Sequence, residues 1–216
     1  MNPAGKKGPR FTSDRMMDVL KRMHPEAKIE LRYSNPLELI VAVILSAQCT
    51  DKRVNMVTEA LFRKYRTAAD YANVAQEELG RDIKSTGFYN SKAKNIVGMA
   101  RMLVEKFNGE VPRKMEELIE LPGVARKTAN VVLAGAFGIA EGMAVDTHVK
   151  RVSNRLGLTK QDDPVKIEQD LMKFFPKNKW SRATDLLIFL GRYTCIAKKP
   201  NCDKCLLNAD CPSSLV

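Results

Sequence analysis

The sequence predicts an all-α protein. Apolar residues recur at helical spacing along most of the chain, residues that cap helices stand before these segments, and signals for strands are nearly absent. Glycine and proline divide the segments, so we expect about ten helices linked by short turns. The 216 residues suffice for one or two domains and for a core that needs no disulfides.

The first half of the chain contains a series of capped helical segments. Residues 1–11 are basic and rich in glycine and proline, and we expect a flexible arm there. Asn35 is predicted to cap a helix whose first residue is Pro36. The run 37–48 is apolar on nearly every side, which is typical of the central helix of a bundle. Asp51 is predicted to cap the next helix, whose apolar stripe comprises Val54, Val57, Leu61, Phe62 and Tyr65.

Shorter segments follow. The stretches 67–70 and 73–76 each have the pattern of a helix start. Residues 91–107 are amphipathic and end at Asn108-Gly109, which is a helix-stop signal. The apolar face of this segment is predicted to contain Ile96, Ala100, Leu103, Val104 and Phe107.

Three more helices are expected in the last third of the chain. Asp146 is predicted to cap one of them. Asp163-Pro164 is predicted to start another, which Pro176 closes. Ser181 is predicted to cap the last long helix, which runs to about Arg192.

The charge of the chain points to a polyanionic partner. There are 36 lysines and arginines against 25 acidic residues, a net charge of +11. Such a surplus indicates nucleic acid first and an anionic membrane second. The longest aliphatic stretch, Leu39 to Leu45, is far shorter than the ~20 residues that span a bilayer. We therefore expect no membrane partner and a soluble protein of the cytoplasm.

A predicted hairpin of two helices, 114–120 and 126–136, carries the most specific local signal. Leu118, Ile119 and Leu121 are expected to pack its first helix. Pro122-Gly123 forms a tight turn, and the second helix then begins with amide groups that suit a phosphate. The alternative is an ordinary corner between two helices, in which the glycine serves geometry alone.

Four of the five cysteines fall within 17 residues near the C-terminus. Cys195, Cys202, Cys205 and Cys211 are separated by six, two and five residues, while Cys49 stands alone. In a reducing compartment such a cluster indicates a metal site more than a disulfide framework. The spacing alone leaves zinc and an iron–sulfur cluster open. We expect Cys49 to be a buried, small apolar residue.

Five motifs together resemble the endonuclease III group of DNA glycosylases. They are LPGVARKTANVVL from Leu121, VDTHVKRVSNRLGL from Val145, LSAQCTD from Leu45, GFYNSKAKNI from Gly87, and the four-cysteine tail. They follow one another in the order and spacing of that family, from about residue 13 onwards. One departure stands at Ala125, where the family usually has a second hairpin glycine.

The resemblance implies a catalytic pair. Lys127 aligns with the family's lysine nucleophile, and Asp146 aligns with its aspartate. The lysine would attack C1′ of the sugar to form a Schiff base that undergoes β-elimination, and the carboxylate would stabilise positive charge at the sugar. The plain alternatives are a phosphate-binding surface lysine and a helix cap. His148 lies two residues from Asp146 and is expected to be structural.

The resemblance also implies a cofactor and DNA contacts. The cysteine spacing is similar to the family's ligand set for a [4Fe–4S] cluster. Gln48 would fill the space left by the flipped nucleotide, and Phe88 would act as an apolar wedge. The alternatives are a polar residue at a helix end for Gln48 and a core aromatic for Phe88. The other DNA contacts that we expect are Gly123, Ala125, Arg126, Lys198, Lys199 and Lys204.

The family fold implies two subdomains, a six-helix barrel with the helix–hairpin–helix at 29–139 and an iron–sulfur domain formed by 1–28 with 140–216. The implied function is that of a monomeric, bifunctional glycosylase and abasic-site lyase acting on oxidised pyrimidines in duplex DNA. The alternatives are a mismatch-specific glycosylase of the same fold, a non-catalytic DNA-binding module and an electron carrier. The mismatch branches typically lack the lysine found at Lys127, which favours the endonuclease III interpretation.

Overall fold

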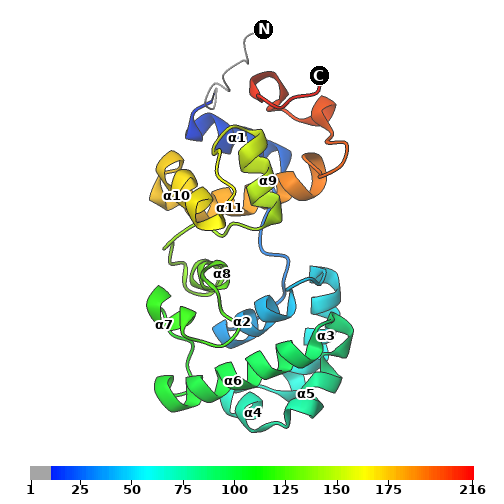
Figure 1. The fold of residues 1–216 in the computed structure, drawn as a ribbon, viewed down its shortest axis with the longest axis vertical. Coiled ribbons are helices and arrows are strands. Elements are labelled where there is room, and N and C mark those ends of the chain that lie inside the picture. Colours follow the sequence, from blue (N-terminus) through cyan, green and yellow to red (C-terminus); the bar gives the residue numbers. More distant parts are fainter. Residues whose placement is uncertain (1–10) are drawn as a thin grey trace. The chain divides into compact units, whose positions relative to one another are not determined.

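The computed structural model describes residues 11–216, and these residues divide into two compact units. One unit is Glu30–Glu141. The other joins the chain up to Ile29 with Gly142–Val216. The described residues contain helices and no strand, so the predicted all-α class is confirmed (Figure 1). Residues 1–10 of the expected arm lie outside the described residues, whereas Phe11 is buried.

The unit Glu30–Glu141 is built around the apolar helix α2, which packs against α3, α6 and α8. The central position predicted for this helix is confirmed, because six of its residues are buried. The long helix α6 also packs against α4 and α5. The helices of this unit are α2 Pro36–Leu45, α3 Asp51–Lys64, α4 Ala68–Asn73, α5 Gln76–Asp82, η1 Lys84–Thr86, α6 Tyr89–Phe107, α7 Met115–Ile119 and α8 Arg126–Phe137.

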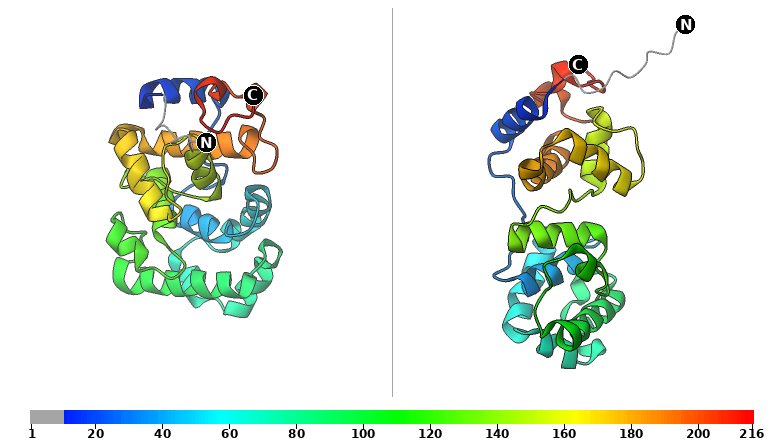
Figure 2. Two further views of the ribbon diagram at one scale, coloured as in Figure 1. Left: turned by 45° about the horizontal axis from the view of Figure 1, so that its top comes forward. Right: turned by 90° about the vertical axis from the view of Figure 1, so that its left-hand side faces the viewer.

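The second unit has α11 at its centre, in contact with α1 and α9, while α9 also packs on α10. The C-terminal segment lies beside α1 (Figure 2), where Arg15 and Asp210 form an ion pair of 2.5 Å. The helices of this unit are α1 Ser13–Met23, α9 Thr147–Arg155, α10 Pro164–Phe174, η2 Lys177–Lys179, α11 Trp180–Phe189, the π-helical turn η3 Leu190–Thr194, η4 Cys202–Lys204 and η5 Asn208–Asp210.

Most predicted helix starts are confirmed, because they depend on local hydrogen bonds. The Asn35 side chain accepts from the Glu38 amide, and Thr67 forms a full capping box with Asp70. Asp146 and Asp163 cap α9 and α10 as predicted.

Three predicted caps are wrong. Thr50, not Asp51, caps α3, and Asp51 is the first helical residue. Asn73 ends α4, and α5 begins after Ala75 without a side-chain cap. Ser181 lies inside α11, which begins at Trp180.

Three side chains differ from their expected burial. Val104 is 44% exposed, because the buried stripe of α6 passes through Ala100 and Leu103 and leaves Val104 at its edge. Ile119 is 49% exposed, because Leu118 and Leu121 occupy the buried positions of the hairpin. Cys49 is half-buried rather than buried. No helix among residues 11–216 is long and apolar enough to cross a membrane.

Candidate functional site

The hairpin between α7 and α8 leaves the N-terminus of α8 bare. Ala125 occupies the cap position with extended backbone and offers no capping hydrogen bond. Its φ of −85° suits any residue, so alanine causes no backbone strain in place of a glycine. No side chain caps the first turn of α8 and no acidic residue lies in it. The backbone amides of that turn and the positive end of the helix dipole can therefore bind an anion.

Gly123 is required by the geometry of the turn. Its φ is +80°, and a Cβ built on it would lie 2.8 Å from the Cβ of Asn95 in α6. Because the Asn95 Cβ is fixed by its own helix, a larger residue at Gly123 would displace the hairpin. Pro122 packs beside Gly98 of the same helix, so α6 supports the whole turn.

Lys127 is exposed in the first turn of α8, directly after the exposed Arg126. No acidic side chain of residues 11–216 forms an ion pair with its ammonium group. An exposed amine at a bare helix N-terminus can bind a phosphate or act on an electrophile beside one.

Asp146 is half-buried at the N-terminus of α9, in the other unit. Its Oδ1 accepts hydrogen bonds from the amides of His148 and Val149, each 2.8 Å long. Oδ2 accepts no hydrogen bond from residues 11–216, so the carboxylate caps its helix with one oxygen only. The His148 ring lies 3.3 Å from the Arg151 guanidinium, which agrees with a structural role.

Three of the predicted DNA-contacting residues have left-handed backbone. The φ angles are 53° at Gln48, 47° at Phe88 and 54° at Lys199, and each side chain is exposed. Among the described residues, one further non-glycine residue, Asn108, has a positive φ, and asparagine tolerates that region. Strained backbone of this kind concentrates at ligand sites. Phe88 is 65% exposed, so the alternative of a core aromatic is wrong.

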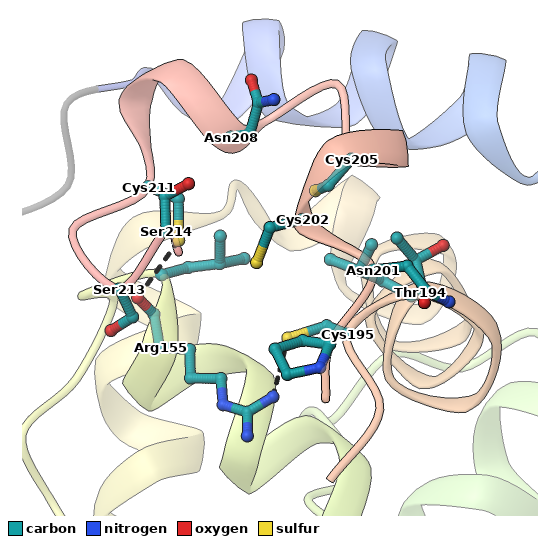
Figure 3. A pocket seen from close by; sticks show the side chains of 13 residues that line it. Arg155, Thr194, Cys195, Asn201, Cys202, Cys205, Asn208, Cys211, Ser213 and Ser214 are labelled. Atoms are coloured by element: carbon teal, nitrogen blue, oxygen red, sulfur yellow. Dashed lines mark hydrogen bonds between the residues drawn. The ribbon is translucent and has the colours of Figure 1, made fainter. Parts of the chain in front are cut away.

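The four C-terminal cysteines line one cavity, with a volume of about 380 Å³ that includes its open mouth (Figure 3). None of the four forms a disulfide. Arg155 organises the loop around them. It donates to the carbonyls of Ile196 and Ala197, both at 2.8 Å, and to the Cys195 sulfur at 3.4 Å. Burial raises the pKa of the thiols of Cys205 and Cys211.

The four cysteines are the candidate metal ligands of this unit. Within residues 11–216, no three histidine, cysteine or acidic side chains converge as ligands of a single metal ion do. Four thiols that line one cavity are donors that both zinc and an iron–sulfur cluster accept. Lys198, Lys199 and Lys204 are exposed on the same loop.

One residue of the site was missed by the sequence interpretation. Lys92 is buried in α6, and its ammonium group bonds the carbonyls of Leu45 and Thr86. The available signal was a lysine on the apolar face of a helix, four residues before Ile96.

Known proteins resemble most of the chain. Residues 41–177 match the family model of the HhH-GPD superfamily of base excision DNA repair proteins. Endonuclease III of Synechocystis is 56% identical over 196 residues, which cover 91% of this chain and 90% of that protein. A solved non-covalent endonuclease III–DNA complex is 51% identical with a TM-score of 0.88, covering 93% and 94% of the two chains. A trapped endonuclease III–DNA covalent intermediate is 50% identical with a TM-score of 0.89, covering 94% and 97%.

Proposed function

Because the chain belongs to the endonuclease III family of the HhH-GPD superfamily, we propose that it removes damaged bases from DNA and cuts the resulting abasic site. It is a DNA glycosylase and abasic-site lyase of base excision repair. Its substrates are oxidised pyrimidines in duplex DNA, and Lys127 and Asp146 perform the chemistry.

DNA binding begins at the positive surfaces. The bare N-terminus of α8 takes a phosphate, with Arg126 beside it and Gly123 keeping the turn close to α6. The exposed lysines of the cysteine loop bind further phosphates. Gln48 fills the space left by the extruded nucleotide, where its amide can pair with a base edge. Phe88 acts as an apolar wedge that stacks between bases. The net charge of +11 makes this binding dependent on salt.

The reaction proceeds through the Lys127 amine. The neutral amine attacks C1′, the bond from C1′ to the base breaks, and the base leaves with the bonding electron pair and a proton. Loss of an amine proton and opening of the sugar ring give a Schiff base. This group acidifies the C2′ proton, whose removal expels the 3′ phosphate by β-elimination. Water then hydrolyses the Schiff base and frees the enzyme.

Asp146 stabilises the positive charge that develops at the sugar as the base leaves. Its Oδ1 is held by two amides, which fixes the direction of the carboxylate. Its Oδ2 accepts no hydrogen bond from residues 11–216 and can accept a proton during the reaction.

A [4Fe–4S] cluster is the cofactor of this chain, and its ligands are Cys195, Cys202, Cys205 and Cys211. When bound, the cluster would be held by these four thiolates and would brace the loop between Cys195 and Cys211. Arg155 supports the same loop from α9 by bonding two of its carbonyls. The loop then presents Lys198, Lys199 and Lys204 as a fixed group.

The observation that carries the proposal is the exposed Lys127 amine at a bare helix end, in a chain similar to one trapped covalently on DNA. The test uses a duplex with one oxidised pyrimidine and measures free base and strand breaks. The wild type is expected to produce both, Lys127→Ala neither, and Asp146→Asn a residual amount reduced by about 10²- to 10⁴-fold. Release of the base without a strand break by the wild type would contradict the lyase assignment.

A further inference from the structure

Lys92 is a buried cation bonded only to backbone carbonyls. Its side chain belongs to α6 and is 4% exposed. The ammonium donates to the Leu45 carbonyl at 2.7 Å and to the Thr86 carbonyl at 2.8 Å. Among residues 11–216 no carboxylate pairs with it, and burial lowers its pKa. A charge buried in this way is costly, so its retention calls for a specific reason.

The two carbonyls belong to the ends of two helices. Leu45 is the last residue of α2, and Thr86 is the last residue of η1. Carbonyls at helix ends lack partners within the helix and carry partial negative charge. One ammonium group therefore caps both ends and holds the two oxygens within about 5.5 Å of each other.

Each of these helix ends leads directly to an exposed, strained residue. Gln48 follows Leu45 by three positions, and Phe88 follows Thr86 by two. Both have left-handed backbone, with φ of 53° and 47°. Such conformations persist only where the surrounding structure fixes the chain on either side. Lys92 supplies a fixed point in front of both residues.

Lys92 also stands on the helix that supports the hairpin. Asn95, three residues further along α6, lies so near Gly123 that a Cβ built on the glycine would be 2.8 Å from the Asn95 Cβ, and a Cβ built on Gly98 would be 3.4 Å from Pro122. The helix α6 thus connects the Gln48 loop, the Phe88 turn and the hairpin within one unit.

We propose that Lys92 is a positioning residue that holds the Gln48 loop and the Phe88 turn in register for extrusion of the damaged nucleotide. The inference rests on the proposed function and adds a residue that acts through two others. It predicts a selective defect, because extrusion of an intact nucleotide needs both loops, whereas an abasic site has no base to unstack.

The experiment compares Lys92→Met with Ile96→Ala. Methionine keeps the length of the side chain and removes the donors. Ile96 is fully buried one turn further along α6 and has no polar group, so its truncation weakens the same core without touching either carbonyl. Circular dichroism establishes that the variants are folded, and Lys92→Gln replaces Lys92→Met if the latter does not fold.

Two substrates separate extrusion from chemistry. The first duplex contains one oxidised pyrimidine, and the second contains a preformed abasic site. Lys92→Met is expected to lose on the order of 10- to 100-fold in single-turnover base release, as misplaced positioning groups do, and less than about threefold in cleavage of the abasic site. A 2-aminopurine beside the lesion should show weaker unstacking with Lys92→Met than with Ile96→Ala.

Equal losses on both substrates, or unstacking equal to that of Ile96→Ala, would reduce Lys92 to a core residue and overturn the inference. A second check combines Lys92→Met with Gln48→Ala and Phe88→Ala. If Lys92 acts through these residues, it should add no further loss of base release in that background. Failure of the wild type to act on either substrate would instead refute the proposed function.

Discussion

Replacing Gly123 by alanine should destabilise the hairpin by two separable effects. The first is backbone conformation, because φ is +80° and an L side chain in the left-handed region costs about 1–2 kcal/mol. The second is overlap, because the new Cβ would lie 2.8 Å from the Asn95 Cβ and 3.1 Å from its Cγ. Overpacking of this kind costs about 1–3 kcal/mol. The expected loss is therefore about 2–5 kcal/mol of unfolding free energy.

Gly109→Ala is the matched control. Gly109 has a φ of +81°, but no atom outside its chain neighbours lies within 4 Å of a Cβ built on it. It should show only the conformational cost of about 1–2 kcal/mol. Urea unfolding followed by far-ultraviolet circular dichroism measures both variants.

The overlap component can also be removed directly. In an Asn95→Gly background the contacting Cβ is absent, so Gly123→Ala should cost no more there than Gly109→Ala costs in the wild type. Equal losses for Gly123→Ala and Gly109→Ala in the wild-type background would refute the close contact between the hairpin and α6.

Three further perturbations test other parts of the structure. Arg155→Ala leaves the carbonyls of Ile196 and Ala197 without their donor, so the iron content and the visible absorbance per protein should fall. The control Arg63→Ala, which removes an exposed ion pair, should leave the iron content and the absorbance unchanged. Asp185→Asn should stabilise the protein at pH 8, because burial raises the pKa of this carboxyl from 3.8 to about 6 and the folded state disfavours its charge. The gain, at most roughly 3 kcal/mol, should fade as the pH falls through 6 and vanish below 3.8, and thermal melts at several pH values measure it. Phe88→Gly should leave the free energy of unfolding unchanged or raise it by up to about 1 kcal/mol, because glycine relieves the left-handed backbone, and it should slow base release. A thermal melt and a base-release assay on one preparation measure both quantities. A fall in stability together with a fall in base release would contradict this prediction.

Local chemistry explains which elements could be predicted from the sequence. Asn35, Thr67, Asp146 and Asp163 cap helices through bonds to amides three residues away or closer, so their role depends on a short stretch of chain. The start of α11 depends on tertiary packing instead. Trp180 is its first residue, and the indole of Trp180 donates to the Phe175 carbonyl, which the Ser181 pattern does not reveal.

The candidate site shows the same division. Periodicity left open whether Phe88 is a core residue or a wedge, because exposure depends on the turn around it. Lys92 could not be assigned, since one of its partners lies 47 residues away in the chain. The cysteines were found from their spacing, but spacing alone left zinc and an iron–sulfur cluster open, and only the resemblance to a known family favoured the cluster.

Lys127 is the residue that we expect to form a covalent bond to DNA. Borohydride is added to the wild-type protein with a duplex containing one abasic site, and the trapped complex is digested and mapped by mass spectrometry. A single adduct is expected on the peptide that contains Lys127, and no adduct is expected with Lys127→Ala. A wild-type adduct on another lysine, or an equal yield from Lys127→Ala, would contradict this expectation.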